Sequence, residues 1–180
     1  MTEITNWFQS NLLALNCNKT HFMQFLTKKQ NERKIKIIAP NSIDTNIKST
    51  KFLVLITDNS LSWKDHIAAL TSKLNRACYA IRSIKPFLFV DILRMICFSH
   101  VHSVMSYGII FWGNSHPSNS IFKIQRRMIR IITNTSSCDL CRQLFKQLQI
   151  LSLPSQYIFS LLVLLTRIEV YSKPILKFTI

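Results

Sequence analysis

The chain has 180 residues, of which 48% are hydrophobic, and its 23 Lys and Arg against 8 Asp and Glu give a formal net charge of +15 at pH 7. The apolar content and the low counts of 2 Gly and 5 Pro exclude a disordered segment or a linker. The positive charge favours a polyanionic partner, most simply a nucleic-acid backbone. The alternatives are an anionic membrane surface and a solvated basic surface with no specific partner.

The cysteines and the first residues predict an intracellular protein with reduced thiols, because Met1–Trp7 has neither the basic region nor the long apolar run of a secretory signal. Met95–Trp112 is long and largely apolar, but His100 and His102 interrupt it. Ile158–Leu165 is too short to span a bilayer. We interpret both stretches as core helices and expect no membrane partner.

The first part of the chain, residues 1–59, is predicted to contain one helix followed by about three strands. Residues 3–14 have helical apolar spacing, and the inward face consists of Ile4, Trp7, Phe8, Leu12 and Leu15. Runs of β-branched and aromatic residues predict strands at residues 19–26, 35–38 and 46–56. So small a sheet is marginal alone, so we expect it to belong to a larger domain.

From residue 60 to residue 180 the pattern is helical, so the predicted fold class is α+β and mostly α. The longest helix, residues 63–84, is expected to be capped by Ser62 and to end before Pro86. Its inward face consists of Ile67, Leu70, Leu74, Ala77, Cys78 and Ile81.

Four further helical segments follow the longest helix. They are predicted at residues 90–106, extended to 112 after a break near Gly108, and at residues 119–132, 139–148 and 154–171. Ser118 is expected to cap the helix at residues 119–132. The inward face of the last helix is predicted to consist of Ile158, Leu161, Leu162 and Leu165.

Several short motifs occur in a fixed order along the chain. The first three are Leu15–Phe25 with Asn16 and Lys19-Thr20, then Lys51–Asp58, then Leu61–Ile67 with its Ser-Trp-Lys-Asp-His sequence. In this order they resemble the end of the palm and the start of the thumb of reverse transcriptases from non-LTR, jockey-like retrotransposons. Later stretches resemble the same family, so the resemblance covers nearly the whole chain; these are Tyr107–Gly113, Ile124–Ile132, Cys141–Phe145 and Leu148–Tyr157.

The resemblance implies RNA-directed DNA synthesis in the intact family. There a primer 3′ hydroxyl attacks the α-phosphate of a nucleotide with the help of two Mg²⁺ ions, which an Asp-Asp pair upstream of these motifs holds. This sequence contains no adjacent Asp-Asp pair. We therefore expect a fragment with no catalytic residues, metal or cofactor of its own, inactive without the missing N-terminal half of the enzyme.

The resemblance also gives roles to residues near the palm. Lys19 corresponds to a lysine of the family that lies near the triphosphate of the incoming nucleotide, a role that it would have in an intact enzyme only. Phe52, Leu53 and Val54 correspond to a Phe-Leu-Gly hairpin that grips the 3′ end of the primer. Val54 replaces the glycine and resists a positive φ, so primer gripping is in doubt. The alternative for these residues is an ordinary buried strand.

Basic residues on the predicted helices are the candidate binding site. Arg126 and Arg130 are one helical turn apart with Arg127 beside them, while Met128, Ile131 and Ile132 are expected to face the core. Such a ridge suits the phosphates of an RNA or an RNA–DNA duplex, recognised by shape and weakened by salt. The predicted binding residues are Lys73, Arg76, Arg82, Lys123, Arg126, Arg127 and Arg130. The alternative is a solvated helix face.

Other candidate sites are weaker. His66 is interpreted as an exposed helix residue rather than a catalytic base. Cys138 and Cys141 form a Cys-x-x-Cys pair, which is half of a structural zinc site. No second pair of ligands completes it, so no metal is expected.

Two alternatives to the polymerase fragment stay open. One is a basic helical nucleic-acid-binding or scaffold module with no polymerase role, and the other is a translated mobile-element relic that does not fold stably. The resemblance implies work on chromosomal DNA and hence the nucleus, but no basic import cluster is evident.

Overall fold

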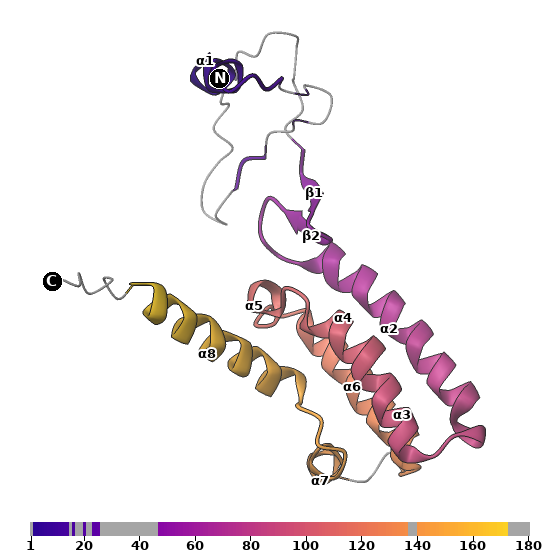
Figure 1. Cartoon of the computed structure of the whole chain (residues 1–180). Helices are drawn as coiled ribbons and strands as arrows, with labels where there is room; N and C mark the ends of the chain where they lie inside the picture. Colours follow the sequence, from indigo (N-terminus) through magenta and orange to yellow (C-terminus); the bar gives the residue numbers. More distant parts are fainter. Residues whose placement is uncertain are drawn as a thin grey trace, which may run out of the picture. The chain divides into compact units, whose positions relative to one another are not determined.

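The computed structural model describes residues 2–14, 16, 20, 23–25, 47–136 and 140–172. Over these residues the protein is α+β and mostly helical, which confirms the predicted fold class (Figure 1). The chain divides into two compact units, residues 1–65 and residues 66–180. The sequence predicts the boundary between the strand-containing part and the helical part a few residues earlier, between residues 59 and 60.

The first unit begins with helix α1, Thr2–Ser10. It is shorter than predicted because the Asn11 side chain and backbone N–H both donate to the Trp7 carbonyl, which closes the last turn. Leu12 follows with a φ of 55°. The predicted inward face is wrong in part, since Trp7 and Leu12 are exposed and Phe8 is half-buried.

The described part of the run predicted as one strand at residues 46–56 belongs to a hairpin instead. Strand β1, Ser49–Phe52, pairs antiparallel with β2, Leu55–Asp58. The two-residue turn consists of Leu53 and Val54, with φ values of 44° and 70°. Such turns normally carry Asn or Gly, so Leu53-Val54 is not recognisable as a turn from its residue types. Of the predicted strand at 19–26 the structure describes Thr20 and Met23–Phe25, which are not in a strand, and residues 35–38 lie outside the described residues.

The last residue of β2, Asp58, holds the backbone just before the long helix α2, Lys64–Ile84. The Asp58 carboxylate accepts hydrogen bonds from the backbone N–H groups of Ser62 and Trp63, both at 3.0 Å. The Ser62 hydroxyl, the predicted cap, is 3.5 Å from the Lys64 nitrogen. Burial tends to raise the pKa of Asp58, but the hydrogen bonds from Ser60, Ser62 and Trp63 outweigh it and hold this pKa below its usual range.

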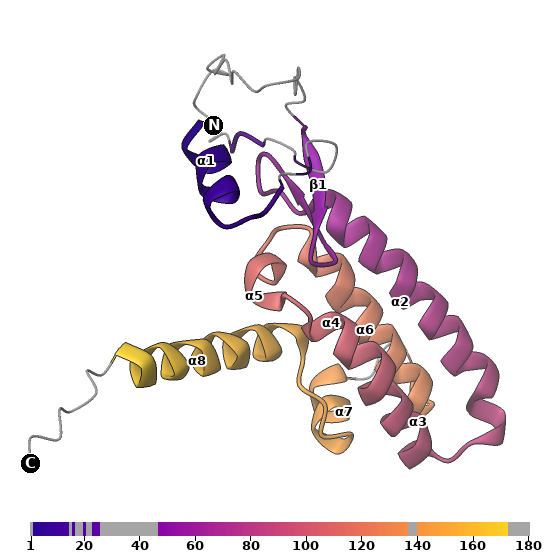
Figure 2. The same cartoon turned by 45° about the horizontal axis from the view of Figure 1, so that its top comes forward.

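The helical unit is built on α2 and on a second helical run antiparallel to it (Figures 1 and 2). That run consists of α3, Val90–Ile96, the π-helix η3, Cys97–His102, and α4, Ser103–Ser106. A short 3₁₀ turn, Lys85–Phe87, precedes it. All six predicted inward residues of α2 are buried, because a strict helical period assigns them to one stripe.

Gly108 breaks the second run with a φ of 61°, as the sequence predicts, and α5, Ile109–Trp112, follows. Helix α6, Ser118–Thr133, then crosses the bundle beside α3. Ser118 does not cap α6, because its hydroxyl donates to the Ser115 carbonyl from inside the helix. The core joins side chains of α2, α3, η3, α4, α5 and α6, among them Leu74, Leu93, Val101, Trp112 and Ile129.

The last two helices are α7, Cys141–Gln147, and α8, Leu153–Ser172. Helix α8 contacts α5, α4 and α6 through its first turns, where Leu153 and Gln156 are buried. The predicted inward face of α8 is wrong for three of its four residues: Ile158, Leu162 and Leu165 are exposed, and Leu161 is half-buried. Among the described helices none has the length and apolar character needed to cross a membrane.

Candidate nucleic-acid interface

Helix α6 separates its side chains into two faces. Ile121, Ile124 and Met128 are buried in the core, whereas Lys123 and Arg127 are exposed. Arg126 and Arg130 are half-buried, so part of each side chain packs against the bundle, and the Nε atom of Arg130 is itself buried. The predicted basic ridge therefore exists. Ile131 was expected in the core, but it is half-buried at the edge of this ridge.

A groove of about 580 Å³ runs along the basic side of α6 and the end of α2. We call it the basic groove, and its lining residues are Arg82, Lys85, Lys123, Arg126, Arg127, Arg130, Ile131, Asn134 and Thr135. Five of the seven predicted binding residues line it, and none of its lining residues is acidic. Two helices far apart in sequence thus concentrate positive charge in one concave surface, which raises the local concentration of a polyanion.

Lys85 is a member of the basic groove that the sequence did not single out. Its Nζ atom donates to Oδ1 of Asn134 over 2.5 Å. Asn134 ends α6 in the left-handed conformation with a φ of 59°, and its backbone N–H donates to the Arg130 carbonyl. The available signal was the spacing of Lys85 three residues after Arg82, just before the proline that ends the helix.

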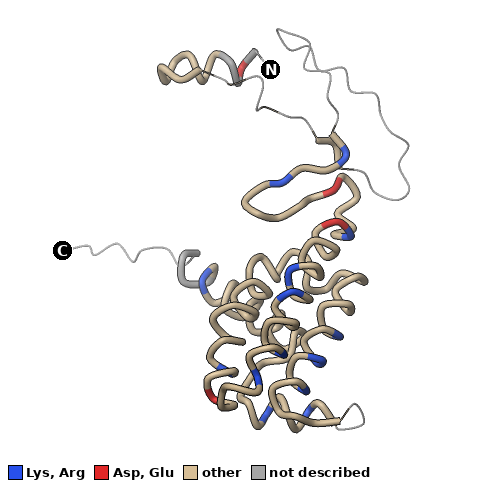
Figure 3. The backbone as a smooth tube through the Cα atoms, turned by 90° about the vertical axis from the view of Figure 1, so that its right-hand side faces the viewer, with Lys and Arg blue, Asp and Glu red and all other residues tan. Residues whose placement is uncertain are grey.

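The helical unit has a large excess of positive over negative side chains. Residues 66–180 contain fourteen Lys and Arg against three Asp and Glu. Figure 3 shows blue positions on several helices of this unit and few red ones. Because exposed like charges repel one another, an anion that binds the groove relieves repulsion as well as making contacts, and salt screens both effects.

Two predicted binding residues do not belong to the basic groove. Lys73 and Arg76 lie with His100 along a separate groove between α2 and the antiparallel run of α3, η3 and α4. The floor of this groove is apolar and includes Ala77 and Val101. The structure therefore places Lys73 and Arg76 apart from the other five predicted binding residues, in a different groove from Arg82.

His66 is buried, so the prediction of an exposed residue is wrong. Its ring centroid lies 5.9 Å from that of Trp112, the largest of the fully buried side chains among the described residues. Burial lowers the pKa of His66, and the Lys73 ammonium lowers it further. The residue is a neutral part of the core at pH 7 rather than a base at a surface.

The hairpin residues are surface groups. Phe52, Leu53 and Val54 are exposed by 67%, 67% and 54%, which makes the ordinary buried strand wrong for this segment. Val54 has a φ of 70°, a conformation that glycine adopts without strain and that valine resists. Lys19 lies outside the described residues.

Over the residues that the structure describes, no three His, Cys, Asp or Glu side chains come together to hold a metal ion. Cys138, half of the sequence's Cys-x-x-Cys pair, lies outside those residues. Burial raises the pKa of Cys97 to about 11 and also raises that of Cys78, so both thiols stay protonated at neutral pH.

The later motifs have structural roles that the sequence did not reveal. A side chain on Gly113 would meet the Ile109 carbonyl oxygen at 2.6 Å and the Tyr157 ring at 2.7 Å. Gln125 is buried, and its side chain both donates to the Leu151 carbonyl and accepts from the Leu153 N–H, each over 2.9 Å. Gln125 thereby ties the α7–α8 connection to α6.

Comparison of the chain with protein-family models, with curated protein sequences and with solved structures found no match.

Proposed function

We propose that this chain forms the end of the palm and the thumb of a reverse transcriptase of the non-LTR class. Its helical unit holds the phosphate backbone of an RNA or of an RNA–DNA duplex in the basic groove. The observation that supports the proposal is the gathering of Arg82, Lys123 and the three arginines of α6 in one groove with no acidic lining residue. All five are among the binding residues that the sequence predicts.

The groove suits a backbone rather than a base sequence. Its polar groups are mainly Lys and Arg side chains, which position a duplex through its phosphates and carry little sequence information. Binding of this kind releases counterions, so the logarithm of the affinity falls by about 0.9 per neutralised phosphate for each tenfold rise in salt. Contact with several phosphates therefore predicts a steep salt dependence.

The proposal assigns no chemistry to this chain by itself. DNA synthesis would require carboxylates that hold Mg²⁺, and the missing N-terminal half of the enzyme would supply them. Primer extension with the chain alone in the presence of Mg²⁺ is expected to give no product. Nucleotide incorporation by the isolated chain would contradict this part of the proposal.

The binding part is tested with an RNA–DNA duplex titrated with the full chain across a salt series. The test variant removes three exposed cations of the groove through Arg82→Gln, Lys123→Gln and Arg127→Gln. The matched control removes the same charge elsewhere through Lys48→Gln, Lys64→Gln and Arg167→Gln. The groove variant should reduce the salt slope by about 3, at 0.9 per charge, and the control by much less.

Absent binding, salt-insensitive binding or equal weakening of the two triple variants would refute the proposed groove. Heparin and vesicles of anionic lipid provide a further comparison. If either of these competes as well as the duplex does at equal charge, the chain is better described as a general polyanion-binding module.

A further inference from the structure

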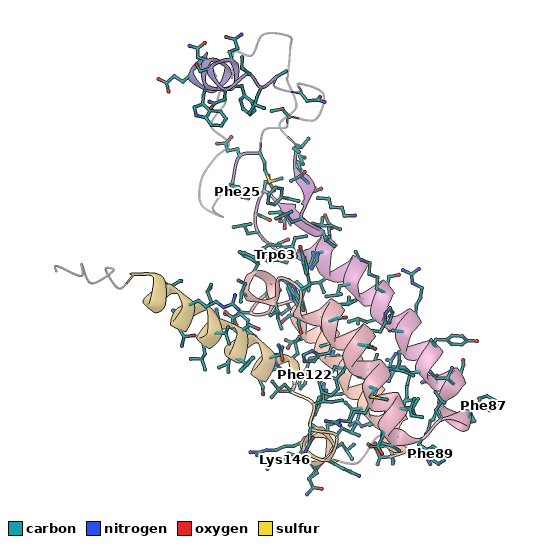
Figure 4. The ribbon with its side chains drawn as sticks, viewed as in Figure 1. Phe25, Trp63, Phe87, Phe89, Phe122 and Lys146 are labelled. Atoms are coloured by element: carbon teal, nitrogen blue, oxygen red, sulfur yellow. The ribbon has the colours of Figure 1, made fainter. Side chains whose placement is uncertain are left out.

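A second pocket lies between α6 and α7 and shares Arg126 with the basic groove. We call it the aromatic pocket; it has a volume of about 540 Å³, and its lining includes Phe122, Arg126, Arg142, Phe145, Lys146 and Ser152. Figure 4 labels two of these residues, Phe122 on α6 and Lys146 on α7. The volume falls within the range of small-molecule sites.

Arg126 lines both the aromatic pocket and the basic groove. On a helix, the direction of residue 126 lies about 40° from that of residue 122 and about 40° from that of residue 130, at about 100° per residue. Arg126 therefore stands between Phe122, which lines only the pocket, and Arg130, which lines only the groove. A single strand of nucleic acid could pass from one site to the other along this side chain.

The inner part of the pocket is a stack of planar groups. The Arg126 guanidinium carbon lies 4.8 Å from the Phe122 ring centroid. The Phe122 and Phe145 rings are stacked with centroids 6.3 Å apart and an angle of 26° between their planes. Phe145 is buried and Phe122 half-buried, so the stack is anchored in the core and reaches the surface at its Arg126 end.

The rim of the pocket is cationic and hydroxylic. Arg142 and Lys146 are exposed, and the hydroxyl groups of Ser152 and Ser155 are 2.8 Å apart. None of the lining residues is acidic. Planar groups that stack, together with cations beside them, match the two halves of a nucleotide, a flat base and an anionic phosphate.

We propose that the aromatic pocket receives an unpaired nucleotide that continues a strand held in the basic groove. Its base stacks on the Arg126–Phe122 pair, and its phosphate meets Lys146 or Arg142. The inference rests on the proposed function for the continuing strand, but it assigns a distinct site and a distinct ligand, a single-stranded extension.

The test compares three ligands with the full chain at one salt concentration. They are a blunt RNA–DNA duplex, the same duplex with a short single-stranded extension, and that duplex with an extension that has the sugar-phosphate backbone but no bases. A stacked base should tighten binding by about fivefold or more over the blunt duplex. The extension without bases should give a much smaller gain.

Phe122→Leu keeps the apolar volume and removes the ring, so it should abolish the gain from the extension and leave binding of the blunt duplex unchanged. Lys146→Ala, at an exposed position, should reduce the gain without affecting folding. Phe89→Leu is the matched control, because Phe89 is 81% exposed and lines neither site. Circular dichroism checks that each variant folds.

The possible outcomes separate the two proposals. Tight binding of the blunt duplex with no gain from the extension, or an equal gain without bases, overturns the aromatic pocket and leaves the basic groove intact. If the blunt duplex does not bind but a single-stranded oligonucleotide does, and Phe122→Leu weakens it, the pocket stands and the groove fails. Binding of none of these ligands overturns both.

Discussion

The two units of this protein differ in how their tightest backbone turns are built. In the helical unit both glycines of the protein occupy positions that need them: Gly108 has a φ of 61°, and Gly113 has no room for a side chain. The helical unit has two left-handed residues that are not glycine, Asn134 and Gln149, whereas the described part of residues 1–65 has five. These five are Leu12, Leu53, Val54, Leu61 and Trp63. Each costs about 1–2 kcal/mol relative to a relaxed conformation.

The difference also extends to the support that each turn receives. The turn at Gly113 packs against Ile109 and Tyr157 of the helical core. The turn at Val54 connects a hairpin of two strands with exposed residues at its tip. A two-stranded hairpin is marginal alone, so strain in it is a large fraction of its local stability. We conclude that the helical unit is the more stable part and that the hairpin is under strain.

The largest effect is expected for Gly113→Ala. The added methyl group would meet a backbone oxygen at 2.6 Å and the Tyr157 ring at 2.7 Å, so the α5–α8 contact must open. We expect a loss of about 2–3 kcal/mol in the free energy of unfolding, measured by chemical denaturation. The control is Gly108→Asn, since asparagine tolerates a left-handed φ and should cost less. Equal stability of Gly113→Ala and the wild type would contradict the close packing.

Gln125→Leu is expected to have the next largest effect. It keeps the volume of the side chain and removes both hydrogen bonds to the α7–α8 connection, leaving the buried N–H of Leu153 without its partner. The free energy of unfolding should fall by about 2 kcal/mol. Gln147→Leu, at an exposed position of α7, is the control and should have little effect. If both variants unfold alike, Gln125 does not brace this connection.

Val54→Gly should act in the opposite direction and stabilise the protein. Glycine adopts the φ of 70° without strain, so the hairpin should gain about 1 kcal/mol, even though the unfolded chain becomes more flexible. Amide hydrogen exchange of the β2 residues is the measurement, because it reports local opening. Lys51→Gly, in the extended strand β1, is the control and should accelerate exchange. Faster exchange in Val54→Gly would show that the turn is not strained.

The smallest effect is the pH dependence due to His66. Because burial and Lys73 lower its pKa in the folded state below the ordinary 6.5, the unfolded state binds the proton more tightly. The stabilisation is therefore complete above pH 6.5 and decreases as the pH falls below it. His66→Gln should flatten the curve of unfolding free energy against pH in this range, and Lys73→Gln should flatten it in part. An unchanged curve for His66→Gln would contradict a buried neutral histidine.

Local patterns in the sequence were sufficient to predict where most of the helices lie along the chain. Apolar residues of α2 recur at the helical period, which puts them on one face of the helix. Every side chain of α2 that this period predicts to be inward is buried. The break near Gly108 follows from the one residue type that adopts a left-handed φ freely. The basic side of α6 was likewise evident from the spacing of its arginines, as was the overall fold class.

Only the tertiary structure decided which surfaces meet. The period of α2 could not reveal that Arg82 lines a groove with α6, whereas Lys73 and Arg76 line another groove. It also could not reveal the hydrogen bond from Lys85 to Asn134. His66 is buried beside Trp112, which is far from it in the sequence. Ile158 on α8 is exposed because only the first turns of α8 pack against the other helices. A helical period fixes which side chains share a face, but only contacts between distant segments determine what covers that face.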